Sequence, residues 1–371
     1  MIPLRLRVRV EGDERQEFVV RLRQNLAAPD AGVDAGSREE FDAVIAGQLP
    51  GELVFQTRRS YLRIPDALPA DFDGDVLFVD SRRGVAHRWV RARSAHNTFL
   101  VTERCDQLCI MCSQPPKHTH VDLFEHFTNA ALLAPYGMEL GITGGEPTLY
   151  KNELFDFLAK VSAARPDLRF HILTNAQHFT EDDLAVLRDP AFRRVCWGVP
   201  LYAPDAKTHD AIVAKEGAFN VLLHSLALLL RAGSLVELRT VIMRPNLAAL
   251  PDLAWFVATH LGFIDVWALM QLENIGFARN RWDELFVDHS REFAPVATAA
   301  DIGLSRGINV QFYNCPLCTL PVPYRSRAGR TISDWKQRYL PVCSSCSQRA
   351  ACCGFFEWYP QERGFQGVNP L

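Results

Sequence analysis

Polar and apolar side chains alternate along the first part of the chain. The alternation has a period of two residues in "LRLRVRV" (4–10) and "EFVVRLR" (17–23), and in parts of "GELVFQTRRSYLRI" and "GDVLFVDSRRG". This period is typical of strands with one buried face. Residues 1–96 are therefore predicted to form a β-rich domain. One helix is expected near "SREEFDAVIAG", where Ser37 is a plausible N-cap followed three residues later by Glu40.

From residue 97 to 308 the pattern changes to short apolar runs separated by longer helical ones. The six predicted strands are "NTFLVT" (97), "GMELGIT" (137), "LRFHILT" (168), "RRVCWGVPL" (193), "LVELRTVIM" (235) and "DVWALMQ" (265). Strands that alternate with helices indicate βαβ units and a parallel sheet. Six units are too few for the usual barrel of eight, so we expect an α/β fold with an open barrel or a curved sheet. Ligands then belong at the carboxyl ends of the strands.

Residues 309–371 are rich in Cys, Pro and Gly and have little periodicity. A segment with so little regular core needs a further source of stability, such as a bound metal, to hold its fold. Nine of the ten cysteines fall in two groups, Cys105 to Cys112 and Cys315 to Cys353. Cys196 stands alone, and we interpret it as a small core residue.

Charge and hydropathy narrow the class of partner and the compartment. A net charge of -3, from 40 basic and 43 acidic residues, gives no field that implies nucleic acid or an anionic membrane. The start, "MIPLRLRVRV", does not resemble a signal peptide, and the longest apolar run, "NVLLHSLALLLRAG", is too short to span a membrane. We expect a cytoplasmic protein with reduced thiols, in which metal ligation is the leading explanation for the cysteines.

The first cysteine group is Cys105-x3-Cys109-x2-Cys112, directly after the first predicted strand of the parallel sheet. A four-iron cluster needs four ligands, so three thiolates leave one iron open. Catalytic metal sites keep such a vacant position for substrate. The alternative is a zinc site completed by His118, His120 or a distant residue.

A glycine-rich turn, "LGITGGEPTLY", follows the second of these strands. Gly144 and Gly145 are expected to let a ligand approach the backbone, and Pro147 fixes the exit of the turn. Glu146 offers a carboxylate beside the open iron. Alone, such a turn is as often structural as functional.

Together, the three cysteines and "GGEP" resemble the radical S-adenosylmethionine (radical SAM) enzymes over residues 97 to about 275. The resemblance implies a partial (β/α)6 barrel and a [4Fe-4S] cluster on the three cysteines, with SAM chelating the fourth iron. Glu146 is then expected to fix the SAM amino group. In this family one electron cleaves SAM, and the resulting 5'-deoxyadenosyl radical abstracts a hydrogen atom from the substrate.

The same resemblance implies further cofactor contacts. Met111 stands where the family usually has an aromatic residue, and it either covers the adenine or merely fills core. Thr174 and Asn175 in "LTNA" are expected to contact SAM, although a plain turn also explains them. Arg239 reaches the SAM carboxylate if it faces inward, and is an ordinary exposed strand residue if it does not.

The second cysteine group contains Cys343-x2-Cys346-x5-Cys352, which resembles the SPASM and twitch extensions of radical SAM peptide maturases. The SPASM pattern continues with another cysteine where this chain has Phe356, so the resemblance implies one auxiliary [4Fe-4S] cluster. Its fourth ligand is Cys318 or Cys315, and Cys353 is an alternative ligand or a free thiol. Zinc remains the alternative metal here.

A narrower resemblance, carried by "YNCPLCTLP" and "TISDWKQRYLPVCSSC", is to the maturases of His-Xaa-Ser systems, the HxsC type. It implies a ribosomally made precursor peptide as substrate and a second radical SAM protein as partner. We expect a crosslink as product and an electron donor as a further partner, but the residues identify neither the bond nor the donor. The first 96 residues then dock the peptide or cap the barrel. The alternatives are radical SAM chemistry on a small molecule or a protein residue, and a zinc-stapled binding module.

The sequence identifies no catalytic residue, although Glu273 is a candidate proton or electron acceptor.

Overall fold

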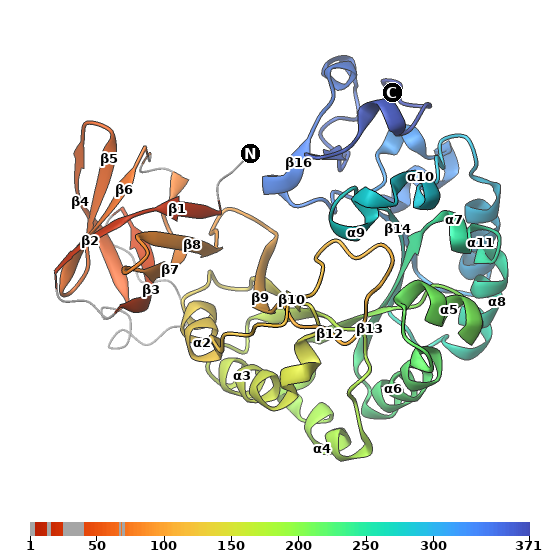
Figure 1. Ribbon diagram of the computed structural model, residues 1–371, viewed down its shortest axis with the longest axis horizontal. Helices are drawn as coiled ribbons and strands as arrows, with labels where there is room; N and C mark the ends of the chain where they lie inside the picture. The colour runs from red at the N-terminus through yellow and green to blue at the C-terminus, as the bar shows by residue number, and fades with distance from the viewer. Residues whose placement is uncertain (1–3, 13–15, 25–40, 67, 69–70) are drawn as a thin grey trace.

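The structure is a computed structural model that describes residues 4–12, 16–24, 41–66, 68 and 71–371. These described residues form three sheets, which follow one another along the chain and have eight, seven and two strands. Figure 1 shows the first sheet beside the parallel sheet and its helices, with the last part of the chain above the carboxyl edge of that sheet. The α/β fold, the β-rich start and the cysteine-rich end predicted from the sequence are confirmed.

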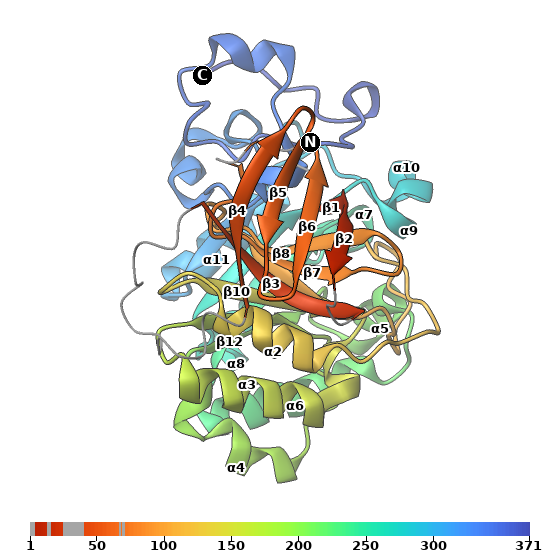
Figure 2. The ribbon, with the colours of Figure 1, turned by 90° about the vertical axis from the view of Figure 1, so that its left-hand side faces the viewer.

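The first sheet curls round on itself (Figure 2). Its strand order is β1-β8-β7-β3-β4-β5-β6-β2. The two ends of this order are consecutive in the chain, because only Val8 separates β1 from β2, and its N–H donates to Gly84 O. Apolar side chains such as Leu22, Leu53 and Leu62 fill the inside. The strands are β1 (Arg5–Arg7), β2 (Arg9–Gly12), β3 (Glu17–Arg23), β4 (Asp42–Leu49), β5 (Glu52–Gln56), β6 (Ser60–Pro65), β7 (Val76–Asp80) and β8 (Val85–Val90).

The prediction of a helix near "SREEFDAVIAG" is wrong for those residues of this stretch that the structure describes. Ser37 and Glu40 lie outside the described residues, and the following residues form strand β4. This strand pairs in parallel with β3 and antiparallel with β5, and Ala43 is fully buried between them. Pairing on both sides outweighs a local helical pattern, and a strand suits the β-branched Val44 and Ile45.

The second sheet is wholly parallel, in the order β15-β14-β13-β12-β11-β10-β9. Six of its strands match the predicted runs. The seventh, Val310–Tyr313, lies beyond residue 308, where four strand residues enter a segment whose Cys and Pro content hid them. The strands are β9 (Asn97–Thr102), β10 (Glu139–Gly144), β11 (Arg169–Leu173), β12 (Val195–Pro200), β13 (Leu235–Ile242), β14 (Val266–Gln271) and β15 (Val310–Tyr313).

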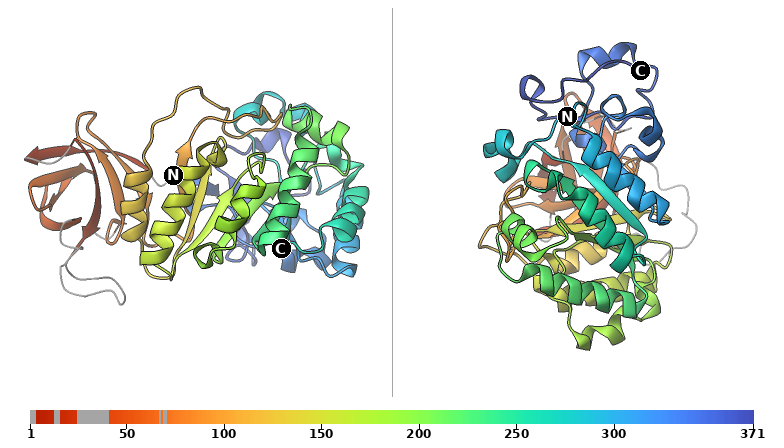
Figure 3. Two further views of the ribbon diagram at one scale, coloured as in Figure 1. Left: turned by 90° about the horizontal axis from the view of Figure 1, so that it is seen from below. Right: turned by 90° about the vertical axis from the view of Figure 1, so that its right-hand side faces the viewer.

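Helices cover one face of this sheet, as the views in Figure 3 show. Alternate strand residues such as Ile142, Trp197 and Leu238 are fully buried against them. The other face therefore carries the intervening residues, among them His171 and Arg239. The helices are α2 (Phe124–Leu132), α3 (Lys151–Ala164), α4 (Leu184–Leu187), α5 (Ala206–Val213), α6 (Ala218–Ala232), α7 (Arg244–Leu247), α8 (Leu250–His260), α9 (Gly276–Asn280), α10 (Trp282–Leu285) and α11 (Ala294–Ser305).

The apolar run "NVLLHSLALLLRAG" forms most of α6, and Leu222, Leu226 and Leu229 bury its inner side. Among the described residues, no single helix is long and apolar enough to cross a membrane. Only α5 and α6 taken together meet that test, and they are bent by 99° at their junction.

The last part of the chain is held by short turns and a small core. Strands β16 (Gln337–Arg338) and β17 (Phe355–Phe356) pair antiparallel, and the core includes Leu340, Phe355 and Phe365. Asp334 joins this region to the first sheet through an ion pair with the buried Arg91, and Lys336 joins it to the barrel through Glu273. These ion pairs tie the last region both to the first sheet and to the parallel one.

Candidate active site

The loop with Cys105, Cys109 and Cys112 begins where β9 ends, at the carboxyl edge of the parallel sheet. Two backbone bonds fix its far side, from Leu108 N–H and Ile110 N–H to the carbonyl groups at the end of α5. The three thiols are half-buried and free. Burial raises the pKa of Cys105 to about 11 and of Cys109 to about 12, so a metal must displace their protons.

The glycine turn packs directly against this loop. Gly145 N–H donates to Thr102 O at 2.9 Å, and Glu146 N–H donates to Arg104 O at 2.7 Å. A Cβ atom on Gly145 would lie 2.1 Å from Arg104 O, and one on Gly144 2.6 Å from Thr102 O. The nearest neighbour of these glycines along the Cβ direction is thus the backbone of the cysteine loop, and their contact with SAM stays a prediction.

Glu146 is fully buried and bonds to two strand ends at once. Its Oε1 accepts from Thr148 N at 2.8 Å, Thr148 Oγ1 at 2.5 Å and Thr174 Oγ1 at 2.7 Å, and its Oε2 accepts from Asn175 N at 2.5 Å. Burial raises the pKa of Glu146, and these four donors oppose the rise. From the described residues Oε2 accepts a single bond, which leaves a lone pair for a further donor.

Thr174 and Asn175 follow β11 and are both buried. Asn175 Nδ2 donates to Asp106 Oδ1 at 2.8 Å and lies 4.0 Å from Cys105 Sγ. The "LTNA" turn therefore touches both Glu146 and the cysteine loop. The structure brings these predicted residues together, and their contact with SAM stays a prediction.

Asp106, which sequence reasoning missed, carries a charged network beside Cys105. Its carboxylate forms an ion pair with Lys215 and lies 3.4 Å from His178 Nε2. Burial acts to raise the pKa of Asp106, but hydrogen bonds from His178, Lys215 and Asn175 lower it well below its usual range. An acidic residue inside the cysteine motif was the available signal.

Gly276, in the "GFAR" stretch, approaches the third cysteine from another side. Its φ is +60°, and a Cβ atom there would lie 2.3 Å from Cys112 O. The next residue, Phe277, donates its N–H to the same carbonyl at 2.8 Å. The start of α9 therefore supports the cysteine loop, so a positive φ and a close approach explain glycine at this position.

Met111 is buried in an apolar cluster with Tyr202, Ile212, Met243 and Leu272. This position agrees with the core-filling alternative. A contact between Met111 and the adenine stays a prediction.

Arg239 faces the side of the sheet away from the helices, but its charge is already paired. It forms an ion pair with Glu237, which also accepts from Tyr313 Oη at 2.8 Å and lies 3.1 Å from His171 Nε2. Burial acts to raise the pKa of Glu237, but His171, Arg239 and Tyr313 lower it to about 2. Contact between Arg239 and the SAM carboxylate stays a prediction.

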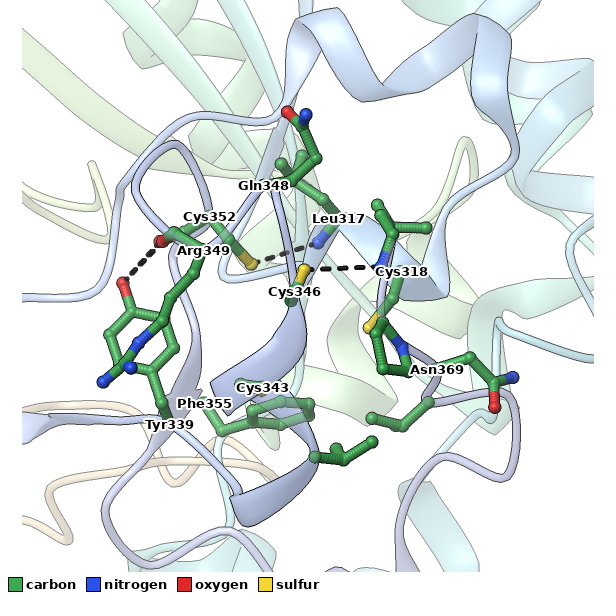
Figure 4. A pocket seen from close by; sticks show the side chains of 14 residues that line it. Leu317, Cys318, Tyr339, Cys343, Cys346, Gln348, Arg349, Cys352, Phe355 and Asn369 are labelled. Atoms are coloured by element: carbon green, nitrogen blue, oxygen red, sulfur yellow. Dashed lines mark hydrogen bonds between the residues drawn. The ribbon is translucent and has the colours of Figure 1, made fainter.

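A second group of thiols lines a cavity in the last part of the chain (Figure 4). Four cysteines face it: Cys318, Cys343, Cys346 and Cys352. Cys315 and Cys353 are almost fully buried outside the cavity, and Cys315 Sγ donates to Tyr313 O at 3.3 Å. Of the alternatives left open by the sequence, the structure places Cys318 with the other three thiols.

The thiols of the cysteine loop and of the cavity are suitable ligands for iron–sulfur clusters. Within the described ranges, no three Cys, His, Asp or Glu side chains converge closely enough to share one metal ion. A four-iron cluster does not require such convergence, because each thiolate binds a separate iron. Four thiols would complete one cluster, whereas three leave an iron open.

Comparison with known proteins agrees with this geometry. Residues 99–254 match the family model of the Radical SAM superfamily. No curated protein sequence matches the chain significantly.

Several solved structures are similar at low identity. SuiB from Streptococcus suis, solved with S-adenosylmethionine, is 15% identical with a TM-score of 0.49, and the match covers 60% of this chain and 51% of SuiB. A radical SAM methyltransferase from Sphaerobacter thermophilus is 12% identical with a TM-score of 0.43, over 70% and 72% of the two chains. The structure of anSMEcpe with bound AdoMet is 13% identical with a TM-score of 0.39, and the match covers 58% of this chain and 62% of anSMEcpe. The chain thus spans about half the length of SuiB.

At TM-scores below 0.5 these likenesses carry no argument. The assignment rests on residues 99–254, which contain the three cysteines, the glycine turn and four of the seven parallel strands completely. Residues 99–254 therefore form a domain of the Radical SAM superfamily, whose enzymes bind a [4Fe-4S] cluster and S-adenosylmethionine.

Proposed function

We propose that this enzyme modifies a ribosomally made peptide and carries an auxiliary [4Fe-4S] cluster beside its SAM-binding one. The observation that carries the proposal is the cavity lined by Cys318, Cys343, Cys346 and Cys352, outside the part of the chain that matches the superfamily. Four thiolates complete the coordination of a cluster, which suits electron transfer and leaves no iron for SAM.

The residues around Cys105, Cys109 and Cys112 would hold the first cluster and SAM. When bound, the cluster supplies the electron that cleaves SAM to a 5'-deoxyadenosyl radical. Glu146 would accept a hydrogen bond from the SAM amino group through the free lone pair of Oε2. Asn175 and Asp106 hold the cysteine loop against the end of β11. The chain's own part is therefore to position the cysteines and the cofactor.

The peptide substrate is supported by the arrangement of the second cysteine group, which resembles the extensions of peptide maturases, and by the motifs shared with His-Xaa-Ser systems. SuiB has been solved with its precursor peptide SuiA. In this proposal the product is a crosslinked peptide, a second radical SAM protein and an electron donor are partners, and residues 1–96 contribute to docking. We place the reaction in the cytoplasm, where the thiols stay reduced.

The first test is the metal content of protein purified without oxygen. Two clusters require about eight iron and eight sulfide per chain, and either Cys105→Ala or Cys352→Ala should remove about half. Cys196→Ala is the matched control, because Cys196 belongs to neither group. Stoichiometric zinc without sulfide would contradict the proposal.

The second test is coexpression with the candidate precursor peptide, followed by mass spectrometry and assay of 5'-deoxyadenosine. A crosslink should lower the peptide mass by the hydrogen atoms removed. If the enzyme cleaves SAM but leaves every supplied peptide unchanged in mass and in configuration, the peptide part of the proposal fails.

A further inference from the structure

Residues 368–371 form one side of the cavity with the four thiols. Val368, Asn369, Pro370 and Leu371 all line it, and Figure 4 shows Asn369 beside Cys318. Asn369 and Pro370 are exposed on their outer side, whereas Val368 and Leu371 are half-buried. The segment is thus both part of the cavity lining and part of the surface of the protein.

One backbone N–H group of this segment points at a thiol. Leu371 N–H donates to Cys346 Sγ at 3.4 Å. Elsewhere around the cavity, Leu317 N–H and Gly354 N–H donate to Cys352 Sγ at 3.4 Å and 3.3 Å. The segment therefore supplies a donor to Cys346, whereas Leu317 and Gly354 serve Cys352.

The segment is anchored on both sides. Leu371 O accepts from Ser347 N at 2.9 Å and from Ser347 Oγ at 2.7 Å, directly after Cys346. Before the segment, Gly367 N–H donates to Ser290 Oγ at 2.9 Å. These bonds hold the Leu371 N–H group in place relative to Cys346 Sγ.

We propose that residues 368–371 cover the auxiliary cluster and that the Leu371 N–H raises its reduction potential. The inference rests on the proposed function, because it requires a cluster in this cavity. An N–H group that donates to a cluster sulfur stabilises the more negatively charged, reduced state. Removal of that donor makes reduction harder and shifts the potential to a more negative value.

The experiment compares Leu371→Pro, which lacks the N–H, with Leu371→Ala, which keeps the N–H and loses the side chain. Both are made in the full chain carrying Cys105→Ala, Cys109→Ala and Cys112→Ala, so that only the auxiliary cluster gives a signal. Iron and sulfide content and an EPR-monitored redox titration are the measurements. Activity is not needed for this readout.

The parent triple variant should bind about four iron. If it binds none, the auxiliary cluster of the proposed function fails before the inference is tested. With the cluster present, Leu371→Pro should have a more negative potential than Leu371→Ala. If Leu371→Pro loses iron and Leu371→Ala does not, this result would also support the contact between the Leu371 N–H and Cys346. Equal potentials and equal iron content in Leu371→Pro, Leu371→Ala and the parent would overturn the inference.

Discussion

Asp106 forms an ion pair with Lys215, and this contact joins the cysteine loop to the segment that follows α5. Asp106 also accepts from Asn175, so three separate parts of the chain meet beside Cys105. The position of the first thiol therefore depends on residues more than 60 positions away in the sequence.

Asp106→Asn is expected to weaken SAM binding without unfolding the protein. The carboxylate is partly exposed, so loss of its ion pair costs about 1 kcal/mol, or roughly a fivefold rise in Kd. Equilibrium dialysis of the reconstituted enzyme measures this change. Asp283→Asn, which breaks the exposed pair with Arg363, is the matched control and should leave the Kd unchanged. An unchanged Kd in Asp106→Asn would show that the network does not position the SAM site.

Gly145→Ala is expected to prevent the cysteine loop from reaching its position. The added methyl group would lie 2.1 Å from Arg104 O, a backbone atom that cannot rotate away. Overpacking of this kind costs about 1–3 kcal/mol or more. The melting temperature of the protein and the iron content of the first cluster should both fall.

The control for this prediction is Gly329→Ala, because a Cβ atom there meets nothing within 4 Å. It should retain the melting temperature and the iron of the wild type. A Gly145→Ala variant with normal iron and stability would mean that the loop has room to move.

Cys318→Ser and Cys315→Ser should differ in their effect on the auxiliary cluster. Only Cys318 lines the cavity with the other three thiols, whereas Cys315 is buried beside Tyr313. Iron should fall by up to about four per chain in Cys318→Ser and stay unchanged in Cys315→Ser. The opposite result would assign the fourth ligand to Cys315.

His289 is expected to make the stability of the protein depend on pH below about 6.5. Its side chain is fully buried, its Nε2 lies 2.8 Å from Thr319 Oγ1, and burial lowers its pKa to about 3. The folded state thus binds fewer protons than the unfolded state, so the contribution is complete above the unfolded pKa. Each pH unit below it removes about 1.4 kcal/mol, until the folded pKa is reached.

The measurement is the melting temperature of wild type and His289→Gln at pH 7.0, 6.0 and 5.0. The glutamine variant is less stable at pH 7.0, because it loses packing, but its melting temperature should fall less on acidification. His224→Gln is the control, since that side chain is exposed on α6. Parallel curves for wild type and His289→Gln would contradict the assignment.

The sequence predicted local features well. The period of the apolar residues indicated six of the seven parallel strands, and the spacing of Cys105, Cys109 and Cys112 indicated the superfamily. It failed where pairing with distant chain decides the outcome. Strand β4 was expected as a helix, and the short β15 was hidden among cysteines and prolines, because neighbouring strands stabilise both.

What the sequence by itself determined is therefore the kind of chemistry: residue types and spacings within one loop select a cluster with an open iron. Only the tertiary structure decided the partners of that loop and which thiol lines a cavity together with Cys343, Cys346 and Cys352. Gly144 and Gly145 pack against the cysteine loop, and Cys318 faces a cavity that Cys315 does not. Such choices depend on which distant segments pack together, and the spacing along one chain carries no information about that packing.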